Sequence, residues 1–78
     1  MPAELHNKAH IYAAPRLLRL PEVIQTTGLA RSTVYDGIRA GTFPAPVPLT
    51  ATARAWRSDE IDVWIADRIA ERDAGTPA

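Results

Sequence analysis

Three prolines at alternate positions constrain the fold of this chain more than any other feature. Pro44, Pro46 and Pro48 are separated by single residues, so the stretch cannot be helical and cannot lie inside a sheet, because proline has no N–H to donate. In an extended strand the three missing donors fall on one side, while the residues between them keep theirs on the other. The pattern predicts an edge strand. Its expected partner is residues 54–57, reached through residues 50–53.

Two short helices are predicted before the prolines. The first begins at Pro21, since proline suits the first turn of a helix, and ends before Gly28, which is expected as a left-handed residue just past the helix. The second helix spans about residues 31–40, with two apolar side chains four positions apart on its buried face and a further glycine after it. The sequence therefore predicts two helices joined by a sharp turn.

A third helix is predicted from about Ser58 to residue 72, with an acidic first turn. It carries an amphipathic stripe of four residues, Ile61, Trp64, Ile65 and Ile69. Both tryptophans, Trp56 and Trp64, lie in apolar patterns, so core packing is favoured over the stacking of bases on their rings. The expected fold class is mainly α with a small β-hairpin.

A chain of 78 residues holds one small core. We expect a flexible arm over residues 1–14, one domain over 15–72 and a frayed tail over 73–78. His6 and His10 have the i, i+4 spacing of a helical metal pair, but no third ligand lies near them in the sequence. A solvated tail is the favoured interpretation, and no metal or other cofactor is predicted.

Catalysis has little to build on in this sequence. There is no cysteine, and no glycine-rich phosphate loop or motif-placed carboxylate pair is present. An enzyme is therefore not expected. No apolar run has the length of a signal peptide core or a membrane span, which predicts a cytoplasmic protein that is not associated with a membrane.

Charge is unevenly distributed although the net charge is zero. Up to Arg57 the chain has seven basic and three acidic residues, a net charge of +4, and from Ser58 onward it has two basic and six acidic residues, a net charge of −4. This asymmetry suggests one part that binds a polyanion and another that faces away or meets a partner. The alternative is that the acids only keep the last helix soluble.

The two helices and the turn between them carry most of the functional signal. Such a pair is either a helix-turn-helix, whose second helix enters the major groove of DNA, or an ordinary helical hairpin. The neighbouring basic hairpin favours the first, as the wing of a winged helix-turn-helix. The predicted base-reading residues are Ser32, Thr33, Tyr35, Asp36 and Arg39. The predicted phosphate-binding residues are Arg16, Arg19, Arg31, Arg54 and Arg57.

Several motifs in fixed order resemble the AlpA-like prophage regulators, small relatives of MerR-type winged helix-turn-helix proteins and phage excisionases. These motifs are Arg16-Leu17-Leu18-Arg19-Leu20-Pro21-Glu22-Val23, Thr27-Gly28-Leu29-Ala30-Arg31-Ser32-Thr33-Val34-Tyr35, Gly41-Thr42-Phe43-Pro44 with Pro46-Val47, Trp56-Arg57, Glu60-Ile61 and Trp64-Ile65. The resemblance covers residues 16 to about 72. It implies a protein that binds double-stranded DNA, and either regulates transcription or directs excision beside an integrase by bending the DNA.

The chain departs from the pattern of these regulators at several positions. Ala30 replaces a serine that would cap the second helix, Asp36 replaces a basic or neutral residue, and Gly37 costs a helix about 1 kcal/mol relative to alanine. The wing tip, residues 50–53, lacks the glycines and lysines often found there. A single copy is therefore expected to bind DNA weakly. Cooperative head-to-tail binding of several copies would raise the overall affinity. The competing hypothesis is an adaptor that contacts an integrase or polymerase through the same helix.

Overall fold

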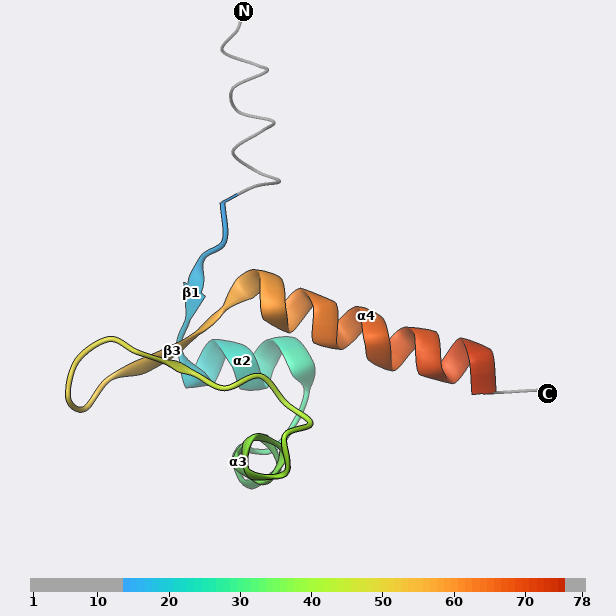
Figure 1. The fold of residues 1–78 in the computed structure, drawn as a ribbon, viewed down its shortest axis with the longest axis horizontal. Coiled ribbons are helices and arrows are strands. Elements are labelled where there is room, and N and C mark those ends of the chain that lie inside the picture. Colours follow the sequence, from blue (N-terminus) through green and yellow to red (C-terminus); the bar gives the residue numbers. More distant parts are fainter. Residues whose placement is uncertain (1–13, 76–78) are drawn as a thin grey trace, which may run out of the picture.

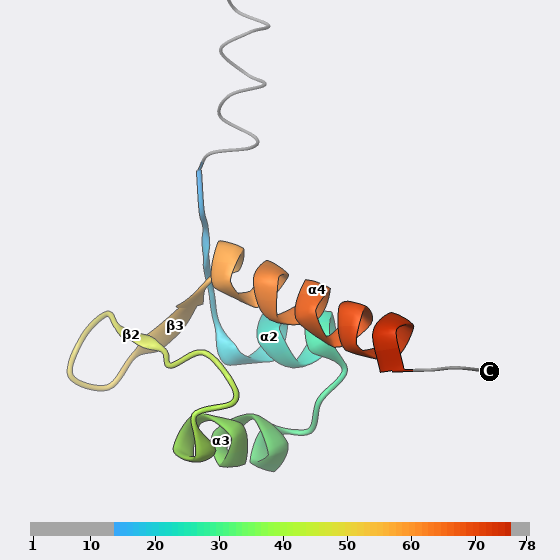
Figure 2. The ribbon, with the colours of Figure 1, turned by 45° about the vertical axis from the view of Figure 1, so that its right-hand side comes forward.

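The computed structural model describes residues 14–75; the expected arm over residues 1–14 and the histidine pair lie outside them, except for Ala14. The elements are β1 (Leu17–Leu18), α2 (Leu20–Thr27), α3 (Arg31–Ala40), β2 (Val47–Pro48), β3 (Arg54–Arg57) and α4 (Ser58–Gly75). The β2–β3 hairpin projects to one side of the body and α4 to the other, with α3 below α2 (Figures 1 and 2). This confirms a mainly helical winged helix-turn-helix.

Left-handed glycines end both short helices, as predicted. Gly28 has φ 76° and donates its N–H to the Ile24 carbonyl oxygen, and Gly41 has φ 78° and donates to that of Ile38. Any other residue would be strained at these φ values. The first helix begins at Leu20, one residue before Pro21, and the Glu22 carboxylate accepts the Arg19 N–H at 3.2 Å. Local capping chemistry therefore fixes both ends of α2 and the C-terminal end of α3, whose first residue follows Ala30 without a side-chain cap.

The sheet has three strands in the order β1-β3-β2, one more than the expected two-stranded hairpin. β2 is an edge strand, which confirms the prediction from the prolines, although it is shorter than the proline stretch. β1 pairs antiparallel with β3, placing Leu18 opposite Trp56. Two hydrogen bonds continue this pairing into α4: Ser58 donates its N–H to the Arg16 carbonyl oxygen at 2.8 Å, and the Arg16 N–H donates to Ser58 Oγ at 2.7 Å.

Single residues of β1, α2, α3, β3 and α4 meet in the core with one residue of the segment that follows α3. Its buried members are Leu18, Val23, Val34, Phe43, Trp56 and Ile61. Trp56 is 1% exposed and donates its indole N–H to the Pro44 carbonyl oxygen at 3.0 Å, and half-buried Trp64 donates to that of Thr42 at 2.9 Å. The two indoles therefore fix the segment that leads from α3 to the wing, in agreement with the predicted packing role of both tryptophans.

α4 is longer than predicted and extends past the core. The helix continues to Gly75, so the first three residues of the expected frayed tail are helical. All residues from 66 to 75 are exposed, including Ile69, which was expected on the buried stripe and is 47% exposed. The second half of the helix extends away from the other elements (Figure 1).

Gly37 lies where α3 packs closely against the following segment. A Cβ placed on it would lie 2.8 Å from Phe43 Cβ, and its carbonyl oxygen accepts the N–H of Thr42 at 2.9 Å and that of Phe43 at 3.2 Å. The glycine that weakens the isolated helix therefore allows the chain to turn tightly back against α3.

We expect Gly37→Ala to destabilise the domain by about 1–3 kcal/mol, because the overpacking exceeds the gain in helix propensity of roughly 1 kcal/mol. Urea unfolding measures the difference. Gly75→Ala is the control, since a Cβ there meets nothing within 4 Å. An unchanged or higher midpoint for Gly37→Ala would show that Phe43 moves aside without cost.

Candidate nucleic-acid interface

Three arginines from separate elements surround one hollow of about 280 Å³. We call this hollow the arginine saddle; its lining residues are Arg19, Leu20, Pro21, Arg31, Tyr35, Thr52, Arg54 and Trp56. They come from the start of α2, the first turns of α3 and the wing, and none of them is acidic. Guanidinium groups grouped in this way favour an anion, and planar guanidinium suits phosphate in particular.

Local contacts hold the saddle together. Arg19 donates from Nε to the Arg54 carbonyl oxygen at 3.0 Å, which ties the start of α2 to the wing and leaves the two terminal amino groups of Arg19 for a ligand. Across the saddle, the Arg31 guanidinium lies over the Tyr35 ring, 5.8 Å from its centroid. Arg31 is exposed and Tyr35 is half-buried, so this pair can present both a cation and a phenol hydroxyl to a ligand.

The other predicted base-reading residues lie around the rest of α3. Ser32 and Arg39 are exposed, and Arg39 forms an ion pair with Asp36 one turn away. Thr33 and Asp36 line a different hollow of about 300 Å³, between α3 and α4, together with Trp64. Tyr35 is thus the one member of this set that lines the saddle, and Asp36 offsets the charge of Arg39.

Arg57 and Arg16 do not line the saddle. Arg57 donates to both carboxylate oxygens of Asp59, from Nε at 3.0 Å and from a terminal amino group at 2.7 Å. The hydrogen bond to Arg57 lowers the pKa of Asp59 below its usual value, and the same bond raises the pKa of Arg57. Asp59 therefore stays ionised throughout the neutral range, and Arg57 approaches a phosphate only in competition with it.

We expect Asp59→Asn to raise affinity for DNA by a few fold at low salt, because the guanidinium of Arg57 is then free to meet a phosphate. Fluorescence anisotropy with a labelled duplex measures the change at several salt concentrations. Asp62→Asn is the control, because it removes the same charge from the same helix without an arginine partner among the residues described. Equal gains in the two variants would show that only net charge matters.

Sequence reasoning missed the residues that shape the wing. Thr52 lines the saddle, and Thr50 Oγ1 accepts the N–H of Thr52 at 3.3 Å and that of Ala53 at 3.0 Å. A threonine side chain that accepts backbone N–H groups two and three residues ahead is a known turn motif. The Thr50-Ala51-Thr52 sequence carried this signal, so the tip forms a defined turn without glycine.

Within residues 14–75, no group of three or more histidine, cysteine, aspartate or glutamate side chains is placed to hold a metal ion. Over the same residues, no helix has the length and apolar character needed to cross a membrane.

Comparisons with known proteins point to one group. Residues 16–69 match the family described as Prophage CP4-57 regulatory protein (AlpA). The chain is 48% identical over 63 residues to protein ORF88 of Enterobacteria phage P4, covering 81% of this chain and 72% of that protein. It is 42% identical over 62 residues to the DNA-binding transcriptional activator AlpA of Escherichia coli (strain K12), covering 72% and 89% respectively. The arginine saddle lies wholly within the matched residues.

Proposed function

The chain belongs to the AlpA family of prophage regulatory proteins, and from this premise we propose that it binds double-stranded DNA sequence-specifically and regulates transcription, without catalysis. The observation that carries the proposal is the arginine saddle, where the start of α2, α3 and the wing each place one guanidinium group around one hollow. One relative, matched over 89% of its own length, is a DNA-binding transcriptional activator. The site of action would be the bacterial cytoplasm, at the nucleoid.

In this mechanism the saddle holds the DNA backbone. Arg19, Arg31 and Arg54 bind phosphate and so fix how deeply α3 enters the major groove. Phosphate contacts of this kind are sequence-independent and weaken steeply as salt rises. Arg16 and Arg57 would add backbone contacts at the flanks, where Arg57 must first leave Asp59.

The exposed face of α3 would supply sequence specificity. Arg39 is suited to guanine, Asp36 to the amino group of cytosine, and Ser32, Thr33 and Tyr35 to further base edges. The ion pair between Asp36 and Arg39 is exposed, with side chains 67% and 71% exposed, so it costs little to separate. DNA sites whose base edges form hydrogen bonds with both Asp36 and Arg39 would therefore be preferred over sites that bond only one of them.

Cooperative loading is the second part of the proposal. The few cations of one copy favour modest affinity, and the acids of α4 could meet the basic wing of the next copy in a head-to-tail array. Such an array would bend its DNA, which is the arrangement an excisionase needs beside an integrase. The competing function is an adaptor that contacts an integrase or polymerase through the face of α3.

The test is a selection of bound fragments from the genome that encodes the chain. A site over a promoter is the expected result for a regulator. Repeated direct sites beside an attachment core would assign excision instead. Failure to enrich any fragment would contradict sequence-specific binding and favour the adaptor.

A further inference from the structure

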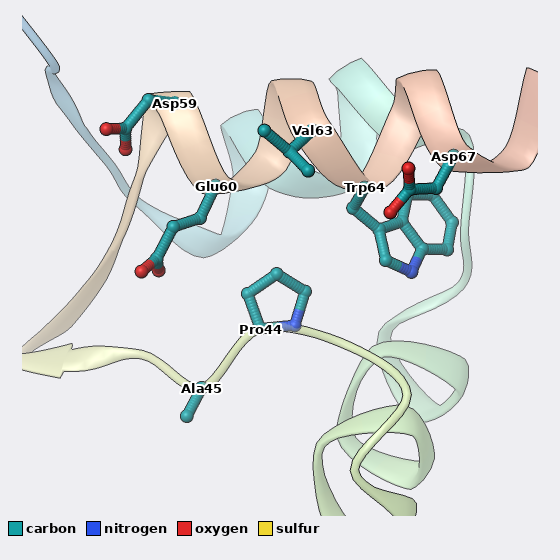
Figure 3. Close-up of a pocket in the computed structure, with 7 residues that line it drawn as sticks. All are labelled: Pro44, Ala45, Asp59, Glu60, Val63, Trp64 and Asp67. Atoms are coloured by element: carbon teal, nitrogen blue, oxygen red, sulfur yellow. The ribbon is translucent and has the colours of Figure 1, made fainter.

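A second hollow, of about 510 Å³, runs between α4 and the segment that follows α3 (Figure 3). We call it the α4 groove; its lining residues are Pro44, Ala45, Asp59, Glu60, Val63, Trp64 and Asp67. None of these residues lines the arginine saddle. A ligand of the groove therefore does not compete with DNA for the side chains of the saddle.

The groove has an apolar wall that is already in place. Two contacts hold Trp64: its indole N–H donates to the Thr42 carbonyl oxygen at 2.9 Å, and its ring packs edge-on against Phe43, with centroids 5.0 Å apart and an interplanar angle of 67°. Beside it on α4, Val63 is 60% exposed. An occupant that covers this wall would remove apolar surface from water without reorganising the fold.

Two carboxylates lie on either side of this apolar wall. Glu60 and Asp67 are seven residues apart on α4, which separates them by about 10 Å along the helix axis. Among residues 14–75, neither of them has an ion-pair partner, whereas Asp59 is bonded to Arg57. The groove therefore presents two carboxylates that no cation of the described chain is bonded to, with an apolar surface between them.

These carboxylates determine the chemistry of the occupant. They repel phosphate, so nucleic acid is disfavoured, and they attract cations. The arginines of the same chain that lie close to the groove are already bonded, Arg57 to Asp59 and Arg68 to Glu71 at 2.6 Å. The complementary positive charge is therefore expected from another molecule, and the apolar wall requires that this molecule also bring an apolar side chain.

The dimensions of the groove suit an extended basic segment. In an extended chain the residues i, i+2 and i+4 point to the same side, and positions i and i+4 are about 13 Å apart. An apolar residue at the centre can then contact Val63 and Trp64. Basic residues two positions to either side can reach Glu60 and Asp67, because long flexible side chains absorb the small difference in spacing.

We propose that the α4 groove binds an extended segment of another protein, in which one apolar residue has a basic residue two positions away on each side. This inference goes beyond the proposed function and does not depend on it. A chain that holds DNA in the saddle keeps the α4 groove for this segment, because the two sites share no lining residue. A copy bound to DNA would thereby recruit a second protein.

The experiment titrates the full-length, isotope-labelled chain with the end-blocked peptide Arg-Ser-Leu-Ser-Arg at low salt. Nuclear magnetic resonance follows the indole N–H of Trp64, with the buried indole of Trp56 as the internal reference. We expect a saturable shift of the Trp64 signal and none of the Trp56 signal. The control peptide Arg-Arg-Ser-Ser-Leu has the same composition but places both cations on one side, and it is expected to bind at least about tenfold more weakly.

Two matched pairs of variants locate the binding. Glu60→Gln is expected to weaken the probe about three- to fivefold, whereas Asp62→Asn removes the same charge outside the groove and is expected to change its affinity less than about twofold. Val63→Ser is expected to weaken the probe about fivefold or more. Ile69→Ser is its control, because this residue is also exposed, at 47%, and does not line the groove. Circular dichroism establishes that each variant is folded.

Three results would overturn the proposal. Equal affinity for the two peptides, or equal losses in the groove variants and their controls, would show that charge or exposed apolar area alone explains the binding. A Trp64 signal that shifts with protein concentration in the absence of peptide would assign the groove to a second copy. Displacement of the probe by a DNA duplex would show that the two sites are not separate. A chain that binds the probe and no DNA would overturn the proposed function alone.

Discussion

Replacement of both Arg31 and Tyr35 by alanine is expected to weaken DNA binding about a hundredfold or more. Arg31 lines the saddle and supplies a charge-assisted contact, worth about 1.5–3 kcal/mol, and Tyr35 adds a further hydrogen bond of roughly 1 kcal/mol. Every 1.4 kcal/mol or so is a factor of about ten in affinity. Neither side chain is buried, so the fold is expected to persist.

Fluorescence anisotropy at fixed salt measures this loss, with the thermal midpoint measured alongside. Arg68→Ala is the matched control, because it removes one exposed cation on α4, away from the saddle. The salt slope of the double variant is expected to fall by about one released ion, as for the loss of one phosphate contact. Unchanged affinity in a folded variant would favour the adaptor hypothesis.

Trp56→Ala is expected to cost about 3–5 kcal/mol of the free energy of unfolding, as for other buried aromatic residues cut to alanine. The indole is 1% exposed and lies opposite Leu18 in the sheet. A domain of this size has a total stability near the low end of about 5–15 kcal/mol. Much of the protein would therefore be unfolded at room temperature, as seen by near-ultraviolet circular dichroism and urea titration.

Trp56→Phe separates packing from hydrogen bonding at the same position. The phenyl ring retains much of the apolar volume but leaves the Pro44 carbonyl oxygen without its indole donor, which costs about 1–3 kcal/mol when the group is buried. We expect its stability to lie between that of the parent and that of the alanine variant. Equal stability of the phenylalanine variant and the parent would show that the bond does not hold the wing segment.

The features that local chemistry determines were predicted from the sequence. Gly28 and Gly41 end their helices in the left-handed conformation, and the alternate prolines confine β2 to the edge of the sheet. Each of these follows from the conformational limits of one residue type. The family resemblance then supported the winged helix-turn-helix that these elements already predicted.

Features that depend on distant parts of the chain were not predictable in the same way. β1 has two residues, too few for a pattern, and it forms because β3 lies beside it in the fold. Gly37 was interpreted as a weakness because its close contact with Phe43 is visible only in three dimensions. Ile69 is exposed because the core ends before the stripe does.

The candidate site also has one part that was predictable from the sequence and another that depends on the fold. The sequence predicted ten DNA-contacting residues, and the structure gathers Arg19, Arg31, Tyr35 and Arg54 around one hollow. The structure also pairs Arg57 with Asp59 and Arg39 with Asp36. These partners lie only two and three residues apart in the sequence, so both ion pairs were possible from the sequence alone. Their assignment as base-reading or phosphate-binding residues stays a prediction.

The most direct test of sequence-specific binding compares two duplexes of equal length at one salt concentration, the genomic fragment selected by the protein and a shuffled version of it. We predict affinity at least about a hundredfold higher for the selected fragment, since specific binding exceeds non-specific binding by 10³ or more in typical regulators and weak single-copy binding lowers that ratio. Equal affinity for the two duplexes would contradict the account.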